Sequence, residues 1–449
     1  MKELEAYRRV VRALPAGMEL AEAEAEKRDS LFAEIVNGKP AGRGASEKTV
    51  LFVRVAGGGR TGMVYTQNLS ADPLSVLKEA MSSAACAPRN ATPLMNGPCA
   101  GEAEDGKQTH SSFSALLQRS AELETLLRGI SPSLTHVSVT VTETIRETGI
   151  VNSLGLDRTV SSCMVQAEVK LTVEGKCHRD LSLETTAPSL AELSDSYFFG
   201  RVKEWLALPV QNISLPCGRL PAVLDGQVLC NIFLTAWQMF SAENYLRRAT
   251  PCFGKLGQKL FADCISLSDL PTALASGFVR LQDCEGTISR RVDAVQNGAF
   301  AGLMHNLSTA AAMGEKSTGS AGRDFNLISD RTETTVIPAN FRLLPGTANQ
   351  SDLLSSLRDG IYICESYDMF HSVNIASGDF SIPCRGVIYR GGKPAGMAQG
   401  ITMNGSLPEL FSEAEQVADD LTTVAMPMSG SLHVASPSLL VRSLNVAGE

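Results

Sequence analysis

Residues that alternate between apolar and polar side chains are the feature of this sequence that most restricts its fold. The runs HVSVTVTETIRETGIVNSLG and LDRTVSSCMVQAEVKLTVEG, residues 136–175, alternate and are rich in β-branched side chains. This period of two is typical of strands with one face against a core. Helical and strand patterns are grouped along the chain instead of alternating as βαβ units. We therefore predict an α+β protein with mostly antiparallel sheets and flanking helices.

Another alternating run, MELAEAEAEKRDSLFAEIV at residues 18–36, can be interpreted in two ways. Its alanines and glutamates favour a helix by intrinsic propensity, whereas the strict alternation favours strands. Asn37-Gly38, which follows directly, is a strong signal for a two-residue hairpin turn. We therefore predict strands here.

The glycine-rich segment AGGGRTG, residues 56–62, raises the question of a phosphate-binding loop. Such a loop leads from a strand into a helix, because the helix N-terminus binds the phosphate. The residues that follow, MVYTQ, are strand-like, and no Gly-Lys-Ser or Gly-Lys-Thr occurs in the chain. We predict a hairpin turn instead.

Composition shifts along the chain predict its domains. Residues 91–108 lie in a segment rich in Pro, Gly and small residues, and a proline-containing segment precedes residue 224. We predict an N-terminal α+β domain over residues 1–90, a linker or long loop over 91–108, a middle α+β domain over 109–215 and a larger, strand-rich C-terminal domain over 216–449. The predicted helices span residues 4–14, 72–85, 112–128, 189–207, 226–248, 307–313, 351–359 and 407–420. Asn404-Gly405 and several similar pairs are predicted turns.

Charge and cysteine usage exclude several classes of function. The net charge is -8 and the basic residues are scattered, which argues against direct nucleic-acid binding. No apolar run approaches the roughly 18 to 20 residues that span a bilayer, so no membrane association is expected. The 11 cysteines form no Cys-x-x-Cys pair, and the N-terminus has no apolar secretory stretch. We expect a cytoplasmic protein.

No local motif announces a catalytic or metal site. The six histidines are too far apart in sequence for a zinc motif, and Cys177 and His178 are neighbours that would point to opposite faces of a strand. The nucleophile motif Gly-x-Ser-x-Gly does not occur. In the 226–248 helix, FLTAWQMF places packing residues where a buried helix could carry ligands. Its broad apolar surface predicts a helix that is buried on most sides.

The order of several segments resembles the TldD/PmbA family. QDCEGTISRRVDAVQNGAFAGLMHNLSTAAAMGEKSTGSAG, residues 282–322, resembles the family's hairpin with Glu-Gly-x-x-x-Arg-Arg, its Asn-Gly turn and its Lys-Ser-Thr-Gly loop. Further similar segments are VRVAGGGRTGMVYTQNLS, IVNSLGLDRTVS, VNIASGDFS, GITMNGSL, VADDL and PSLLVRSLNVAG. Together they cover nearly the whole chain.

The resemblance implies one of two kinds of subunit. TldD-type members are metallopeptidases with an HExxxH motif on the first helix of the C-terminal domain and a later cysteine ligand. PmbA members, also called TldE, lack these ligands and pair with a TldD subunit. Here the expected metal-helix positions hold Phe233, Thr235, Trp237 and Phe240, no cysteine follows Cys384, and His433 is the only late soft ligand. The chain is similar to the PmbA type, so we expect no catalytic metal and no cofactor of its own, with zinc only in a TldD-type partner.

The resemblance implies a metal-free subunit that helps to bind or enclose unfolded peptides for proteolysis or peptide maturation by its partner. Two loops have the small, exposed residues that strand-like peptide binding needs, although the same residues also make tight turns. The predicted peptide or partner contacts are Lys316, Ser317, Thr318, Gly319, Ser377, Gly378, Asp379 and Ser381. A homodimer is a further expectation.

Two other functions remain open on the sequence. One is a stand-alone peptidase with a site assembled without metal, whose first suspects are His371, Asp379, Cys364 and Cys384. The other is a regulator or scaffold, in keeping with the family's label of DNA gyrase modulator.

Overall fold

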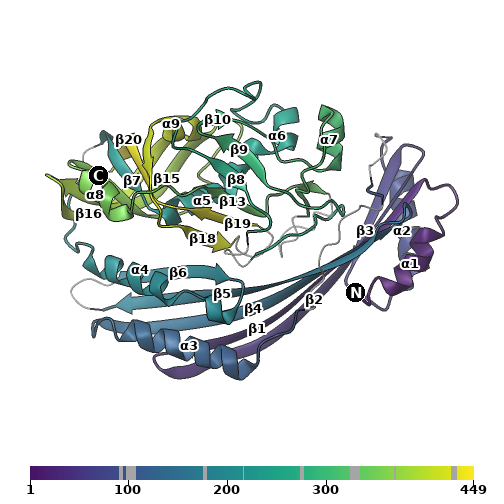
Figure 1. The fold of residues 1–449 in the computed structure, drawn as a ribbon, viewed down its shortest axis with the longest axis horizontal. Coiled ribbons are helices and arrows are strands. Elements are labelled where there is room, and N and C mark those ends of the chain that lie inside the picture. The colour runs from purple at the N-terminus through teal and green to yellow at the C-terminus, as the bar shows by residue number, and fades with distance from the viewer. Residues whose placement is uncertain are drawn as a thin grey trace.

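A long curved sheet carries a more compact region on one face (Figure 1). The computed structural model describes residues 1–89, 95–97, 108–174, 179–215, 217–273, 278–323, 334–368, 371–425 and 432–448. The predicted α+β class, with mostly antiparallel sheets, is confirmed.

The curved sheet has six antiparallel strands in the order β3-β2-β1-β4-β5-β6. The strands are β1 (Leu20–Val36), β2 (Lys39–Gly57), β3 (Arg60–Thr66), β4 (Leu134–Asn152), β5 (Asp157–Val173) and β6 (Arg179–Ala187). Helices α1 (Glu5–Arg12) and α2 (Pro73–Cys86) pack at one end of the sheet, and α3 (Phe113–Arg128) and α4 (Asp195–Ala207) pack at the other. A short 3-10 helix, η1 (Leu190–Glu192), precedes α4.

The Ala/Glu run of residues 20–26 forms a strand because both of its faces are occupied. Ala21, Ala23 and Ala25 are fully buried in the core beneath α1 and α2. The alternate residues, Glu22 and Glu24, point to the opposite face, where they are also buried. A helix would mix the two sets on one surface, so tertiary packing overrides the intrinsic preference for helix.

The predicted ranges 1–90 and 109–215 contribute three strands each to this one sheet. β1 from the first range pairs with β4 from the second over 15 residues, from Glu22 opposite Asn152 to Val36 opposite Ser138. The predicted linker, 91–108, lies outside the described residues except for 95–97 and 108. Within it, Asn96 donates hydrogen bonds to the Glu285 carbonyl and the Thr287 hydroxyl, both 2.8 Å away.

The C-terminal region contains two six-stranded sheets around one apolar core. One has the order β10-β9-β8-β13-β19-β18 and the other β16-β15-β14-β7-β20-β17, and only the pairs β13–β19 and β14–β7 are parallel. The strands are β7 (Gly218–Leu224), β8 (Leu267–Asp269), β9 (Val292–Gln296), β10 (Ala299–Phe300), β11 (Ala321–Gly322), β12 (Thr335–Val336), β13 (Asn340–Leu343), β14 (Gly360–Ser366), β15 (Asp379–Arg390), β16 (Lys393–Ser406), β17 (Ala414–Val417), β18 (Thr422–Ala425), β19 (His433–Ser436) and β20 (Leu439–Ala447). The α-helices are α5 (Gly226–Ala236), α6 (Ala242–Leu246), α7 (Leu307–Met313), α8 (Gln350–Ser356) and α9 (Leu407–Ser412).

The predicted helix 189–207 is interrupted, because Leu193 and Ser194 are extended between η1 and α4. Two further helix predictions are too long. The expected helix 226–248 is α5, then the 3-10 helix η2 (Trp237–Phe240), then α6, because Ser241 is extended and its hydroxyl caps α6 at Glu243. The expected helix 407–420 ends at Ser412, and Ala414–Val417 pairs with β20 as β17. In both places a local cap or a long-range strand pairing ends a pattern that periodicity alone would continue.

The turn predictions are mostly confirmed. Asn37 and Gly38 have φ of 48° and 75° between β1 and β2, and Gly58 and Gly59 have 58° and 74° between β2 and β3. Both hairpins therefore use the two positive-φ residues of a type I′ turn. Asn404-Gly405 is not a turn, because it lies within β16 and pairs with Ser381 and Phe380 of β15.

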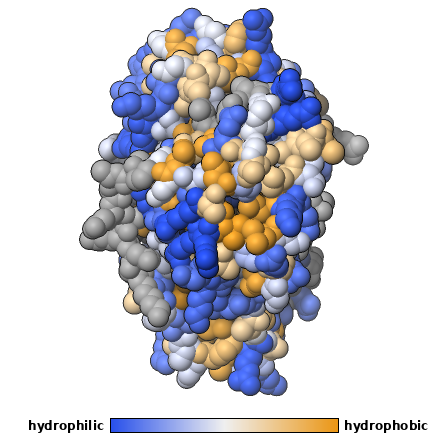
Figure 2. All heavy atoms as spheres, turned by 90° about the vertical axis from the view of Figure 1, so that its right-hand side faces the viewer, coloured by the Kyte–Doolittle hydropathy of each residue, from blue (hydrophilic) through white to orange (hydrophobic). Residues whose placement is uncertain are grey.

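The end of the molecule that carries α1 and α2 has a mixed surface. Figure 2 shows hydrophobic areas between hydrophilic ones on this side. Leu69 and Leu74, beside the start of α2, are 48% and 53% exposed. None of the helices in the described ranges has the length and apolar character needed to cross a bilayer.

Candidate functional site

The helix at the position expected for a metal helix is packed on nearly every side. α5 begins after Asp225, whose carboxylate caps it by accepting the N–H of Gln227. Every residue from Val228 to Ala236 is buried. Such a helix contributes to the core of the C-terminal region and has no open face for substrate.

Phe233 and Phe240 form the centre of an aromatic cluster. They are 0% and 1% exposed. The Phe233 ring stacks on Phe411 at a centroid distance of 5.9 Å and meets Phe341 edge to face at 5.7 Å. The Phe240 ring stacks on Phe341 at 5.8 Å. Rings packed at these distances fill the volume between α5 and the neighbouring strands.

The two polar side chains at the predicted positions bond to the helix itself. The Thr235 hydroxyl donates to the Ile232 carbonyl (3.2 Å), and the Trp237 indole N–H donates to the Leu234 carbonyl (3.1 Å). Across the described ranges, no group of three His, Cys, Asp or Glu side chains lies close enough to hold a metal ion. Phe, Thr and Trp are not zinc ligands, and Cys230 is the one residue of α5 and η2 of a ligand type, so these two helices do not fit a catalytic zinc.

His433, the only late soft ligand of the sequence, is a core residue. It is 0% exposed on β19 and stacks on Phe278 with ring centroids 4.5 Å apart. Burial, with smaller effects from Arg342 and Arg146, lowers the pKa of His433 to about 3. Neither ring nitrogen has a hydrogen-bond partner among the described residues. The imidazole is therefore neutral and has no carboxylate beside it.

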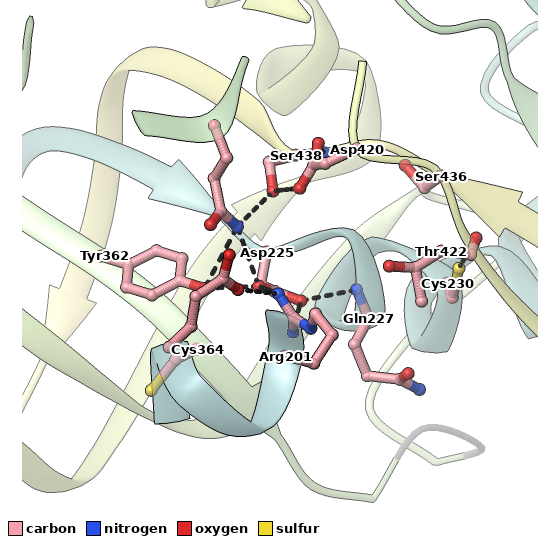
Figure 3. Close-up of polar contacts among 12 residues, drawn as sticks. Arg201, Asp225, Gln227, Cys230, Tyr362, Cys364, Asp420, Thr422, Ser436 and Ser438 are labelled. Atoms are coloured by element: carbon pink, nitrogen blue, oxygen red, sulfur yellow. Dashed lines mark hydrogen bonds and ion pairs between the residues drawn. The ribbon is translucent and has the colours of Figure 1, made fainter. Parts of the chain in front are cut away.

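Asp225 is the hub of a buried polar network (Figure 3). Arg201 of α4 donates to both carboxylate oxygens of Asp225, at 2.9 and 2.8 Å. The Tyr362 hydroxyl also donates to Asp225, and Gln350 donates to it at 3.2 Å. Burial alone would raise the pKa of Asp225, but Arg201 and these hydrogen bonds hold it below its ordinary value. The network joins α4, which packs on the curved sheet, to the start of α5 in the C-terminal region.

Gln350 extends this network to a second acid. Its amide donates to the Ser438 hydroxyl at 2.9 Å, and Ser438 donates to Asp420 at 2.7 Å. Burial raises the pKa of Asp420 to about 6. Sequence reasoning missed the whole network, because only the cap Asp225-Gly226 has a local signal and the other members come from distant segments.

The first predicted contact loop runs from the surface into the interior. Lys316 is exposed, whereas Thr318 and Gly319 are buried. The Ser317 and Thr318 hydroxyls donate to the His305 carbonyl at 3.2 and 3.0 Å. Gly319 has φ of +71°, and a Cβ there would lie 2.5 Å from the Cα of Ser289. The loop is a tight turn in which Lys316 is exposed and Ser317 is half-buried.

The second predicted loop is a turn at the start of β15. Ser377, Asp379 and Ser381 are exposed, and Gly378 is buried with φ of +83°. The Ser377 hydroxyl accepts the Asp379 N–H at 3.3 Å, and the Ser381 hydroxyl donates to Asn404 at 2.8 Å. No hydrogen bond or ion pair joins the two predicted loops in the ranges that the structure describes.

The residues expected for a metal-free peptidase site do not form one site. They differ in burial, and His371 pairs with a different carboxylate from the expected one. His371 is exposed and contacts Asp368, not Asp379, with Nδ1 2.7 Å from the carboxylate. Cys364 and Cys384 are buried, and desolvation raises the pKa of each thiol to about 12. A thiol with such a pKa is protonated at neutral pH and is a poor nucleophile.

A second buried network lies where the Glu-Gly-x-x-x-Arg-Arg segment, residues 285–291, comes close to the face of β1 that carries its glutamates. The sequence analysis did not predict this network either. Glu22 pairs with Arg54 at 2.7 Å, Glu24 with Arg323 at 2.6 Å, and Glu26 with Arg146 at 2.9 Å. Asp283, Glu285 and Arg280 of the C-terminal region lie against them. The alternate glutamates were the available signal, but their partners lie up to 299 residues away.

Several acids in this network hold protons more tightly than usual. Burial raises the pKa of Glu24 to about 7, partly opposed by Arg323. Burial also raises the pKa of Glu285, and the neighbouring Asp283 adds to the effect. Asp283 accepts three backbone N–H groups, from Glu285, Thr287 and Ala321. A cavity of only about 30 Å³ remains between the charges. The network fastens the two regions together and leaves little room for a ligand.

Comparisons with known proteins identify the family of the chain. The profile of the PmbA/TldA metallopeptidase C-terminal domain matches residues 217–448, and that of PmbA/TldA metallopeptidase domain 1 matches residues 21–87. A metalloprotease of Archaeoglobus fulgidus is 24% identical over 213 residues, which cover 47% of this chain and 48% of that protein. The metalloprotease PmbA of Escherichia coli O157:H7 is 21% identical over 231 residues, 51% of this chain and 46% of the relative. The chain thus aligns with about half the length of these curated relatives.

A solved structure extends the similarity in fold to the full chain. TldE from Thermococcus kodakarensis superposes with a TM-score of 0.82 and 18% identity, covering 99% of this chain and 100% of that chain. At this identity the likeness shows the fold alone.

Proposed function

The chain belongs to the PmbA/TldD metallopeptidase family, and we propose that it is a metal-free subunit that helps a metal-bearing partner to bind and enclose unfolded peptides. The observation that carries the proposal is the aromatic packing of Phe233 and Phe240 at the position of the metal helix. A hydrolytic zinc needs three protein ligands and an open coordination position for water. These side chains offer neither, so hydrolysis would depend on another chain.

The positions of the predicted loops support a role in peptide contact. Lys316, Ser377 and Asp379 are exposed on turns that are held by hydrogen bonds. Turns held in this way lose less conformational entropy when they bind an extended peptide. Leu69 and Leu74 offer apolar surface for a partner subunit, with either a TldD-type chain or a second copy of this chain as occupant.

A cytoplasmic location is part of the proposal. All nine cysteines in the described ranges are free. Unpaired thiols in this number are typical of proteins that stay in a reducing compartment.

Reconstitution with a candidate HExxxH-bearing chain from the same cell tests the proposal. Zinc content and cleavage of an unstructured peptide would be measured for this chain alone, for the partner alone and for the mixture. We expect zinc in the partner only, and faster cleavage by the mixture. Stoichiometric zinc in the isolated chain, coordinated by its own side chains, would overturn the proposal.

A matched pair of variants tests the peptide contact. Lys316 and Lys393 are both exposed, but Lys393 lies in the distant β15–β16 hairpin. In the reconstituted complex, Lys316→Ala should raise KM with kcat unchanged, and Lys393→Ala should change neither. Equal effects of the two substitutions would remove the loop 316–319 from the proposal.

The same assay tests a stand-alone peptidase. Cleavage by this chain alone that survives a chelator and is lost in His371→Ala would favour that second function.

A further inference from the structure

A large cavity lies beside the Asp225 network and not in the predicted loops. Its volume is about 270 Å³, and it lies between α4 and β6 on one side and α8, β14, β15 and β16 on the other. An apolar cavity of about 150 Å³ already holds a benzene ring. This cavity therefore has room for an aromatic ring with a short side chain.

The walls of the cavity are mostly apolar. Trp205 is the largest of them, and Tyr389 is another aromatic wall. Further apolar residues that line it are Leu181, Leu183, Leu208, Leu354, Val387 and Pro394. Arg179 stacks on the Trp205 ring at 4.7 Å and donates to the Trp205 carbonyl, which fixes this wall. A rigid aromatic wall favours a flat apolar ligand.

The polar end of the cavity disfavours an anionic ligand, because the arginines there are already paired with carboxylates. Both terminal nitrogens of Arg201 are engaged by Asp225, at 2.9 and 2.8 Å, and Arg385 is engaged by Glu365. An incoming anion would have to compete with carboxylates that are already bound. Arg201 and Arg385 are therefore poor sites for a second carboxylate.

Of the two carboxylates that contact Arg201, Glu204 is the one whose negative charge is less well neutralised. Its oxygen is 3.4 Å from Arg201, farther than either oxygen of Asp225, and its side chain is 56% exposed. Partial burial raises the pKa of Glu204, although Arg201 opposes the shift. Both observations describe a carboxylate that would gain from another cation.

We propose that this cavity binds an ammonium group on an aromatic or large aliphatic body, with the body against Trp205 and the ammonium beside Glu204. Two sources have this chemistry: a free amine, and the N-terminal residue of a peptide that begins with a large apolar side chain. Binding of the free amine depends on the cavity alone, so it is independent of any metallopeptidase partner. The peptide source would deepen the proposed function.

Calorimetric titration of the full chain with phenethylamine tests the proposal. Phenethylamine should bind, and phenylpropionate, which carries a carboxylate on a similar body, should bind at least about tenfold more weakly. Glu204→Gln should weaken phenethylamine binding about two- to fivefold, as expected for a partly exposed ion pair. Glu79→Gln, an exposed carboxylate on α2, is the matched control and should leave binding unchanged.

A blocking variant tests the place of binding. Ala207 lines the cavity but is exposed at the end of α4, so Ala207→Phe can fill the cavity without entering the core. This variant should keep the unfolding temperature of the parent and lose phenethylamine binding. Equal binding of both probes, or unchanged binding in either Glu204→Gln or Ala207→Phe, would overturn the proposal.

The peptide arm uses Phe-Ala-Ala with a free or an acetylated N-terminus. Preference for the free N-terminus would support the cavity as a site for peptide ends. If neither tripeptide binds while phenethylamine does, the site is one for small amines, and the proposed function is unaffected.

Discussion

Replacing Asp225 is the most direct test of how the two regions are coupled. Asp225→Asn keeps a side chain that can cap α5 but removes the charge that faces Arg201. Asp225 is 0% exposed and Arg201 is largely buried, so the substitution leaves the guanidinium with only the half-exposed Glu204, 3.4 Å away, as a counter-ion. Breaking a buried pair in this way costs about 3–5 kcal/mol. Asp225→Ala should cost about 0.5–2 kcal/mol more, because the cap is lost as well.

The free energy of unfolding in urea measures these differences. Asp263→Asn is the control, because the Lys259–Asp263 pair is a surface pair whose aspartate is 81% exposed. Its loss should cost at most about 1 kcal/mol. Combining Arg201→Met with Asp225→Asn should recover most of the stability, since the charge that then loses Arg201 is that of Glu204, whose side chain is 56% exposed. A loss below about 1 kcal/mol for Asp225→Asn would refute the reasoning.

The pH dependence supplies a second readout of the same pair. The pKa of Asp225 is lowered in the folded protein, so its contribution is present above the unfolded-state pKa, about 3.9, and is lost as the pH falls through the lower folded-state value. The difference between the parent protein and Asp225→Asn should therefore be constant near neutral pH and shrink below about pH 4. A difference that stays constant into strong acid would show that Asp225 does not act through its charge.

Three further predictions follow from packing and burial. Phe233→Ala should lower the free energy of unfolding in urea by about 3–5 kcal/mol, whereas Phe253→Ala, at a ring that is 40% exposed, should cost less than about 1 kcal/mol; equal losses would contradict the packing of α5. Gly319→Ala should lower Tm more than Gly314→Ala, because both glycines have φ of +71° but only Gly319 is closely packed; similar shifts in calorimetry would mean that backbone strain alone matters. The pKa of Glu24 is raised to about 7 from 4.5, so its contribution to stability is full below about pH 4.5 and falls as the pH rises to 7; Tm measured from pH 5 to 8 should fall less in Glu24→Gln than in the parent, and parallel curves would contradict this assignment.

The sequence predicts helices and strands well where a local pattern determines them. It predicts them poorly where contacts with distant segments determine them. Alternation identifies β1 despite its helix-forming alanines, and Asn37-Gly38 marks the hairpin that follows. The break at Ser241 was not predicted, because an apolar stripe continues through it and the serine cap is visible only once α6 is known. The pairing of β1 with β4 was also not predicted, because nothing local relates strands more than 100 residues apart.

The site shows the same division between local and distant information. The burial of Phe233 and Phe240 could be predicted from the broad apolar surface of the helix alone. The Asp225–Arg201 and Glu24–Arg323 pairs could not be predicted from the sequence. A charged residue on an amphipathic helix or strand is normally expected to be exposed to solvent. A charged residue points to a buried pair only once the structure shows that its side chain is buried.

The Asp225 network at the start of α5 also bears on the neighbouring cavity. Arg201, Tyr362 and Gln350 hold the N-terminus of α5 by five polar contacts to one carboxylate when the Gln227 cap is included, and a purely apolar helix would not need them to stay buried. Buried ionic networks cost desolvation, and hydrophobic residues of similar volume are often at least as stabilising. Stability alone therefore does not account for the network. Its members Arg201, Gln350 and Tyr362 also line the 270 Å³ cavity, so one set of side chains both fixes α5 and shapes a binding surface. The polar framework is therefore part both of the N-terminus of α5 and of the wall of the proposed ligand site.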